Sequence, residues 1–351
     1  MKISIVVPCR NEAAHIRDFL DSVLAQQLDP DQEIEALIAD GMSTDGTREL
    51  LEEYAARMPA VRVIDNPGRI VSTGLNAGIR AARGEIIVRM DGHTVYAPDY
   101  VRQCARVLGQ SAADNVGGPW VAKGRGRMGR AIAAAFGSRF CAGGGRAHDA
   151  QYEGEVDTVY LGCWRRELFD RAGWFDPELV RNQDDEFNFR LRRLGLRVWQ
   201  SPRIKSEYTP RDSLKALFRQ YSQYGFWKVA VIRKHRAVAS ARHAAPGLFV
   251  ASILTLVVLI GIGAAAGLPE LTRTSGEVLG VEAGVYALAC VGAALAMAGT
   301  LEWRSLVAVP AVIATYHVSY GLGFLAGVVR WIFRGKQRGE GPAGFFTAIT
   351  R

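Results

Sequence analysis

The first 110 residues alternate short apolar runs with amphipathic segments. Apolar runs predict buried strands at Ile3–Val7, Ala36–Ala39, Val61–Ile64 and Glu85–Met90. Apolar residues at helical spacing predict helices over Asn11–Leu24, from the Ser43–Thr47 turn through Tyr54, over Ala77–Ala82 and over Pro98–Leu108. Strands that alternate with helices in this way predict an α/β domain with a doubly wound, mostly parallel sheet.

The pattern changes in the second half of the chain. Ser213–Lys228 carries aromatic and aliphatic residues at helical spacing beside cations, which predicts an interfacial amphipathic helix. From Pro246 onward charges become sparse, and apolar segments at 247–268, 283–299 and 306–329 approach the length needed to span a bilayer. Three crossings would leave the basic tail outside, against the positive-inside tendency, whereas two crossings and one re-entrant or interfacial segment would keep both basic flanks in the cytoplasm.

The chain length fits two structural units. We expect an α/β domain over 1–228 that includes the amphipathic helix at 213–228, and a basic juxtamembrane linker over 229–245. A helical membrane domain follows over 246–333, and a basic tail of cytoplasmic type completes the chain at 334–351.

Charge points to membrane lipids as a partner. The net charge is +8, yet the cations form no nucleic-acid-binding motif, so we expect no nucleic-acid partner. The basic run Arg233–Arg236 precedes the first apolar segment, where such residues mark the cytoplasmic side. Because Met1–Val7 is a strand pattern and not a signal peptide, we expect the α/β domain to lie in the cytoplasm. Oligomeric state is left open.

Cysteine usage adds no metal or redox site. The five cysteines, at positions 9, 104, 141, 163 and 290, lack the paired short spacing of zinc or redox motifs. We expect them to be reduced.

Acidic residues follow two predicted strands and form a third group later in the chain. Asp40 and Asp91 stand at strand ends, and Gln183–Glu186 contains three acids. Ligands of open α/β sheets bind beyond the carboxyl ends of the strands, so these side chains are expected to share one crevice. The first β-α turn, Pro8–Glu12, lacks the glycine-rich cradle of dinucleotide-binding enzymes, which argues against a nicotinamide oxidoreductase.

The succession of motifs resembles family-2 glycosyltransferases of the GT-A fold. The matching segments are Val6–Glu12, Asp40–Thr47, Asn76–Gly84, Asp91–His93, Arg165–Phe169, Phe175–Asp176 and Gln183–Glu186. Together they cover residues 1 to about 228. The Asp-Gly-His and Gln-Asp-Asp-Glu variants, followed by apolar segments, are similar to the membrane-anchored glucosyltransferases of the succinoglycan-biosynthesis type.

The resemblance implies a UDP-sugar site. Asp40 would contact the uracil ring, and the other donor-side residues would be Pro8, Arg10, Asn11, Glu12, Arg69 and Asn76. Ser43 and Asp45 are alternatively explained as caps of the following helix. Asp91 would bind both substrate and a divalent cation, manganese or magnesium, with His93 as a second ligand in place of the usual acid. The alternative is that His93 only hydrogen-bonds phosphate or a neighbouring loop.

On the acceptor side, the resemblance makes Asp184 the general base of an inverting transfer. Asp185 is expected to contact substrate, and Trp164 either stacks on a sugar or belongs to the core. The alternative for the acids of Gln183–Glu186 is a structural role, in which their negative charge stabilises the N-terminus of the following helix. Gln223–Trp227 has phenylalanine where processive enzymes have arginine in Gln-x-x-Arg-Trp, which favours addition of a single sugar.

The resulting hypothesis is a multi-pass inner-membrane enzyme with a cytoplasmic catalytic domain. It would move one hexose, glucose by resemblance, from a UDP-sugar to a polyprenyl-diphosphate-linked saccharide in exopolysaccharide or cell-surface glycan synthesis. The close alternative charges polyprenyl phosphate directly. A non-catalytic membrane adaptor and a glycosidase are alternatives from other classes.

Overall fold

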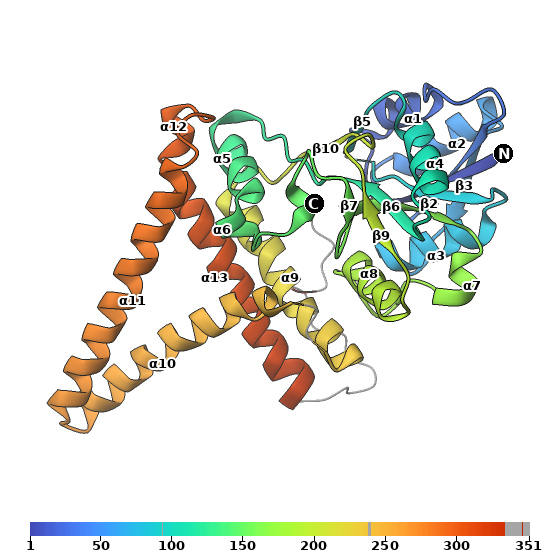
Figure 1. Cartoon of the computed structure of the whole chain (residues 1–351). Coiled ribbons are helices and arrows are strands. Elements are labelled where there is room, and N and C mark those ends of the chain that lie inside the picture. The colour runs from blue at the N-terminus through green and yellow to red at the C-terminus, as the bar shows by residue number, and fades with distance from the viewer. Residues whose placement is uncertain (93, 238–239, 334–345, 347–351) are drawn as a thin grey trace. The chain divides into compact units, whose positions relative to one another are not determined.

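The structure is a computed structural model that describes residues 1–92, 94–237, 240–333 and 346 (Figure 1). The chain forms two compact units. The α/β unit comprises 1–121 and 145–209, and the helical unit comprises 122–144 and the described part of 210–351. This division by internal packing differs from the expected domain ranges, because 122–144 and 210–228 pack with the helical unit.

An eight-stranded mixed sheet forms the centre of the α/β unit. Its strands, in spatial order, are β3 (Val61–Asp65), β2 (Glu33–Asp40), β1 (Lys2–Cys9), β4 (Ile86–Arg89), β8 (Tyr160–Arg165), β6 (Asn115–Gly118), β9 (Val198–Gln200) and β7 (Gly154–Glu155). The first four are mutually parallel, β8 is antiparallel to both neighbours, and β6 and β9 are parallel. A separate antiparallel pair joins β5 (Thr94–Tyr96) to β10 (Ser206–Tyr208). The predicted α/β class with a mostly parallel sheet is confirmed.

Helices connect the strands. They are α1 (Ile16–Leu24), α2 (Thr47–Arg57), α3 (Val71–Ala81), α4 (Tyr100–Gln110), the 3-10 turn η1 (Arg146–His148), α7 (Leu168–Ala172) and α8 (Gln183–Arg193). Helix α1 begins five residues later than predicted, because Asn11 adopts a left-handed conformation with φ of 54° and 13–15 form a turn. Helix α3 begins six residues earlier than predicted.

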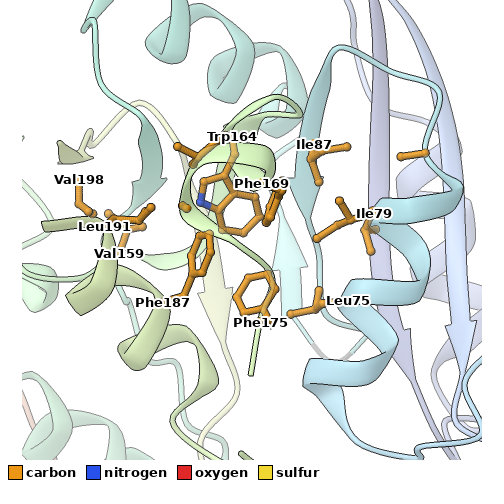
Figure 2. Packing of buried hydrophobic residues seen from close by; sticks show 14 of the residues in the cluster. Leu75, Ile79, Ile87, Val159, Trp164, Phe169, Phe175, Phe187, Leu191 and Val198 are labelled. Atoms are coloured by element: carbon orange, nitrogen blue, oxygen red, sulfur yellow. The ribbon is translucent and has the colours of Figure 1, made fainter. Parts of the chain in front are cut away.

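A hydrophobic core lies between α3, α8 and one face of the sheet (Figure 2). Trp164 lies at its centre, with edge-to-face contacts to Phe169, Phe175 and Phe187 at centroid distances of 5.8–6.0 Å. Neighbouring residues of a strand point to opposite faces, so Cys163 faces the other side and interacts with Cys104 of α4. The two helices α3 and α4 therefore cover opposite faces of the sheet.

The helical unit contains the long helices α9 (Leu214–His235), α10 (Ala245–Ala265), α11 (Pro269–Leu295) and α13 (Val309–Val328). Shorter elements are α5 (Gly126–Gly137), α6 (Arg139–Ala142), η2 (Ala241–His243), α12 (Trp303–Leu306) and the π-helical η3 (Val329–Phe333). Three stretches are long and apolar enough to cross a membrane: Ala245–Ala265, Pro269–Leu295 and Trp303–Trp331.

Helices α9 and α13 cross at backbone contact distance. A Cβ atom on Gly225 would lie 2.1 Å from the carbonyl oxygen of Tyr320, and one on Gly323 would lie 1.9 Å from that of Ser222. Only glycine permits this approach, as at other small-residue helix crossings. The apolar face predicted for 213–228 therefore continues as a 22-residue helix whose inner side is buried against α13.

Candidate active site at the carboxyl ends of the strands

Three adjacent strands end in strained turns on the same edge of the sheet. Cys9, Asp40 and Asp65 are cross-strand neighbours at the ends of β1, β2 and β3. Each strand is followed by a non-glycine residue with positive φ, namely Asn11 at 54°, Met42 at 58° and Arg69 at 59°. Such conformations cost about 1–3 kcal/mol each and cluster at functional sites. This edge is therefore the structural candidate for a ligand site.

The turns after β1 and β2 are tied together by side chains. The backbone N–H of Asn11 donates to Ser43 Oγ at 2.9 Å, and the N–H of Thr44 donates to Asn11 Oδ1 at 2.9 Å. The N–H of Glu12 donates to Thr47 Oγ1 at 2.8 Å. Asn11 thus has a clear structural use, and its predicted contact with substrate stays a prediction.

Asp40 is buried, with 1% of its surface exposed. Ser43 Oγ donates to Asp40 Oδ1 at 2.5 Å, and Arg48 Nη1 lies 3.7 Å from Oδ2. Ser43 therefore holds Asp40 and does not cap α2. Asp45 does serve the helix start, since it accepts from the N–H and the hydroxyl of Thr47.

The pKa of Asp45 reflects that arrangement. Burial alone would raise it, but the Thr47 hydroxyl and the backbone N–H groups of Ala13 and Thr47 lower the pKa below the ordinary value. The capping alternative is thus supported for Asp45, while Ser43 belongs to the Asp40 site.

A second acidic corner forms around Arg89, the last residue of β4. Arg89 is 5% exposed and donates from Nε and Nη2 to the two carboxylate oxygens of Asp91, both at 3.0 Å. Its third nitrogen, Nη1, lies 3.9 Å from Asp184 Oδ2 and is buried without a hydrogen bond to any described residue. Burial lowers the pKa of Arg89, but the charges of Asp91 and Asp184 outweigh it and raise the pKa, so the cation is retained.

Tyrosines fix the backbone of this corner. The N–H of Asp91 donates to Tyr96 Oη at 2.6 Å, and Thr94 Oγ1 and Tyr160 Oη share a hydrogen bond of 2.7 Å. Burial and the charge of Asp91 raise the pKa of both Tyr96 and Tyr160, so both phenols keep their protons. The Glu12 carboxylate faces the turn, because Oε2 would lie 3.9 Å from a Cβ on Gly92.

Helix α8 presents Asp184 from a firmly held start. Asn182 precedes it with φ of 61°, and the Asp184 side chain is 36% exposed. Glu186, two residues on, is fully buried and forms a two-point ion pair with Arg190. The acids of this turn therefore have different roles. Glu186 stabilises the fold, whereas Asp184 lies beside Arg89. Asp185 donates its N–H to Asp184 Oδ1 at 2.9 Å.

The segment that leads into α8 is anchored to α3. Asn76 Nδ2 donates to the carbonyl oxygen of Phe175 at 2.8 Å, and Asn76 Oδ1 accepts the Phe175 N–H at 3.0 Å. Ser72 Oγ donates to the carbonyl oxygen of Leu179 at 3.1 Å. The buried amide of Asn76 thus holds this segment in place, and its predicted contact with substrate stays a prediction.

For Trp164 the burial supports the alternative that it belongs to the core. It is 2% exposed in the aromatic core of Figure 2, so its ring faces are covered and cannot stack on a sugar. Arg69 is exposed, and Pro8 lies within β1. Arg10 packs its side chain against Gly41, and its Nε is buried without a partner among the described residues. His93 lies outside the described residues.

Sequence reasoning missed Arg89 as a site residue. The available signal was a cation inside an otherwise apolar strand, two residues before Asp91. A buried charge requires a partner, so its presence in Ile86–Arg89 indicates a nearby carboxylate.

The donor set suits a hard cation shared with a phosphate ligand. Among the described residues, no group of three or more His, Cys, Asp and Glu side chains could hold a metal ion. Magnesium and manganese sites of nucleotide enzymes use one or two carboxylates together with phosphate oxygens and water. Asp91, with Glu12 beside its turn, fits that smaller requirement.

Comparison with known proteins identifies the relatives of this chain. The family model described as glycosyl transferase family 2 matches residues 4–163. The succinoglycan biosynthesis protein ExoA of Rhizobium meliloti is 31% identical over 91% of this chain and 93% of its own length. A dolichyl N-acetyl-α-D-glucosaminyl phosphate glycuronosyltransferase of Methanococcus voltae, which adds a diacetamido-glucuronosyl residue, is 28% identical over 66% of this chain and 74% of its own.

A solved structure shares the fold. The mannosyltransferase PcManGT of Pyrobaculum calidifontis, determined with GDP-mannose and Mn²⁺, superposes with a TM-score of 0.56 at 18% identity, covering 94% of this chain and 87% of that one. At that identity the likeness concerns the fold alone. The similarity to ExoA along nearly the whole chain, the family match over the strands that carry Asp40 and Asp91, and the GT-A fold establish that this chain belongs to glycosyl transferase family 2.

Proposed function

We propose that the chain is an inverting hexosyltransferase that moves one glucose from UDP-glucose to a polyprenyl-diphosphate-linked saccharide during exopolysaccharide synthesis. The reaction would take place at the cytoplasmic leaflet of the inner membrane. Membership of the family and the named role of ExoA in succinoglycan biosynthesis support the reaction class. Three apolar helices support attachment to a membrane.

The observation that carries the proposal is the Arg89 corner. Arg89 holds Asp91 by two hydrogen bonds, and its Nη1 points toward Asp184 without a hydrogen bond among the described residues. An unsatisfied buried donor is costly, by about 1–3 kcal/mol, so this N–H is a ready partner for an anionic ligand oxygen. A sugar diphosphate supplies such oxygens.

Each acid then has a separate task. Asp40, held by Ser43 and Arg48, would accept the imide N–H of uracil at the far end of the crevice. Asp91 would hold a divalent cation, with Glu12 nearby, and that cation supplies neutralisation of the leaving diphosphate. Arg89 places a fixed positive charge beside the same group, in a site where burial strengthens its effect.

Asp184 would act as the general base. Its side chain is partly exposed, so an acceptor hydroxyl can approach it and donate a proton as oxygen attacks the anomeric carbon. Attack from the face opposite the nucleotide inverts the anomeric configuration. Glu186 cannot replace it, because both its oxygens are engaged by Arg190 in the interior.

The acceptor is proposed from the relatives. The Methanococcus voltae enzyme is named for transfer to a sugar already linked to a lipid phosphate, which favours a lipid-linked saccharide over the bare lipid phosphate. Departure from the Gln-x-x-Arg-Trp pattern at Gln223–Trp227 supports transfer of a single sugar.

The test is nucleotide release by the detergent-solubilised full chain. UDP-glucose, other UDP-sugars and GDP-mannose are compared with Mn²⁺ or Mg²⁺, with polyprenyl-diphosphate saccharide, polyprenyl phosphate or no lipid, and Asp184→Asn is run in parallel. We expect UDP release from UDP-glucose that needs metal and lipid saccharide and disappears in the variant. Release from GDP-mannose alone would overturn the donor. Release stimulated by bare polyprenyl phosphate would overturn the acceptor, and absence of turnover with every donor would contradict the enzymatic function.

A further inference from the structure

One of the three apolar segments differs from the other two in how much protein covers it. In α10 and α11, 11% of the most apolar window is buried within the protein, but in Trp303–Trp331 the share is 39%. The difference arises because α13 packs along α9 as well as against α10 and α11. A helix whose surface is taken up by other helices has less area to offer lipid.

The middle of α9, residues 221–229, packs along residues 316–331 of α13 and the helical turn η3 that follows it. The rings of Tyr221 and Tyr316 lie 4.3 Å apart at one end, and those of Phe226 and Trp331 lie 5.8 Å apart at the other. Between them Gly323 contacts the backbone of Ser222. Residues 316–331 correspond to about 22 Å of helix, and 309–315 add only about 10 Å, against a hydrocarbon core of ~30 Å. If α13 crossed the bilayer, α9 would have to enter it too.

The composition of α9 argues against that entry. The helix carries five cations: Lys215, Arg219, Lys228, Arg233 and Lys234. A lysine or arginine near the middle of a crossing helix costs about 2.5–3.5 kcal/mol even on the most lenient scale. Two of these cations, Arg219 and Lys228, lie inside the helix, and the other three, Lys215, Arg233 and Lys234, are exposed at its two ends. Such a helix is suited to the headgroup region.

The far end of the chain returns to α9. Phe346 stacks on Phe226 at 4.3 Å, and Trp227 Nε1 donates to the carbonyl oxygen of Phe346 at 2.9 Å. Helix α9 starts at Leu214, five residues after the α/β unit ends at Thr209, with Ser213 as its cap. With α9 in the headgroup region, Phe346 lies on the same side of the membrane as α9.

We propose that α13 does not cross the bilayer. Helices α9 and α13 form one interfacial layer against the anionic headgroups of the leaflet that faces the α/β unit, and α10 and α11 alone cross as a hairpin. Both basic flanks, Arg233–Arg236 and the sequence after Arg330, then lie on one side, as the positive-inside tendency requires. The expectation of two crossings with one interfacial segment is the alternative that this packing favours.

The test uses reporter fusions to the full chain in a bacterial host. Alkaline phosphatase, which is active only outside the cytoplasm, is fused after Arg351 or inserted at Gly267 between α10 and α11, and green fluorescent protein is fused after Arg351 in a matched set. We expect an inactive phosphatase and a fluorescent protein at Arg351, and an active phosphatase at Gly267.

Two outcomes would overturn the proposal. An active phosphatase after Arg351 would show that α13 crosses, and an inactive one at Gly267 would show that α10 and α11 do not. Both readouts are independent of sugar transfer, so a failure of the topology is distinguishable from a failure of the proposed function.

Discussion

The two acidic corners at the carboxyl ends of the strands are built on opposite principles. Around Asp40 the carboxylate is buried and engaged by Ser43, with Arg48 nearby. Around Asp91 the central group is a buried cation, Arg89, and one of its nitrogens has no hydrogen bond among the described residues. At the first corner the Asp40 carboxylate already has its partners, whereas at the second Arg89 Nη1 gains a hydrogen bond only when something else supplies an oxygen.

Because of this difference, the two corners are suited to recognising different properties of a ligand: the shape of a base at Asp40 and the charge of a phosphate at Arg89. A corner whose hydrogen bonds are already made can recognise a flat base with little rearrangement, since its own groups are pre-organised. A corner with an unfilled donor stabilises charge that arrives with the ligand or develops in the reaction. The comparison predicts that changes at Asp40 mainly affect donor binding, and that changes at the Arg89 corner affect turnover and folding.

The largest effect is expected for Asp184→Asn. Loss of the proposed base should lower kcat by about 10²–10⁴-fold while the donor KM changes little, because the group acts on the acceptor hydroxyl. The free energy of unfolding should change by about 1 kcal/mol at most, which is the typical contribution of a helix-capping residue. Steady-state kinetics and thermal unfolding measure both. Asp170→Asn, an exposed acid early in α7, is the matched control and should leave kcat unchanged. Equal losses in both variants would contradict the assignment.

Arg89→Met should cause the next largest change, this time in stability. The substitution leaves the mostly buried Asp91 carboxylate without its partner, at a cost of about 3–5 kcal/mol. Denaturant unfolding of the single and double variants measures it. Adding Asp91→Asn should recover part of the loss, because the uncompensated charge disappears. A single variant as stable as the wild type would show that the pair contributes nothing to the fold.

The strand pattern was sufficient to predict the edge on which these corners lie. Parallel strands share the location of their carboxyl ends, so Asp40 and Asp91 could be assigned to one edge from the sequence. It was not sufficient for Trp164, because β8 is buried on both faces and its neighbour Cys163 is equally apolar. Nothing local indicates which of the two residues faces α3.

Contacts between residues far apart in the chain could not be predicted from the sequence either. Asn76 satisfies the backbone of Phe175, 99 residues away, and this partner is visible only after folding. The segment 122–144 joins the helical unit although the α/β unit resumes after it. In both cases the decisive contact is formed by residues with no recognisable spacing between them.

Asp40→Asn tests the proposed role of the Asp40 corner in donor binding. If Asp40 contacts the base, the donor KM should rise about tenfold, a change of ~1.4 kcal/mol, with kcat nearly preserved. Ser43→Ala removes the hydroxyl that holds Asp40 but keeps the carboxylate, so it should raise the KM less. Donor titrations of the two variants decide the matter. Equal effects would mean that Asp40 only secures the turn.

The smallest effect concerns Glu35, an acid on the same strand as Asp40 but away from the crevice edge. Burial raises its pKa, but the Ser4 hydroxyl, the Arg83 N–H and Arg62 together lower the pKa below 4.5. Because the folded pKa is depressed, the stabilisation is fully present above about pH 4.5 and is lost as pH falls through the folded value. Glu35→Gln should therefore destabilise the protein by about 1 kcal/mol at neutral pH and progressively less in acid.

Thermal unfolding from pH 3 to pH 7 measures this dependence, with Glu33→Gln as control. Glu33 begins the same strand, but it is exposed and lies 3.8 Å from Lys2, so its removal should change stability by no more than about 0.5 kcal/mol at any pH. A Glu35 effect that persists unchanged below pH 4 would show that shape, and not charge, accounts for the difference. In that case the hydrogen bonds of a buried acid in this domain would not depend on its negative charge. The contrast between the Asp40 corner and the Arg89 corner could then not be explained by charge.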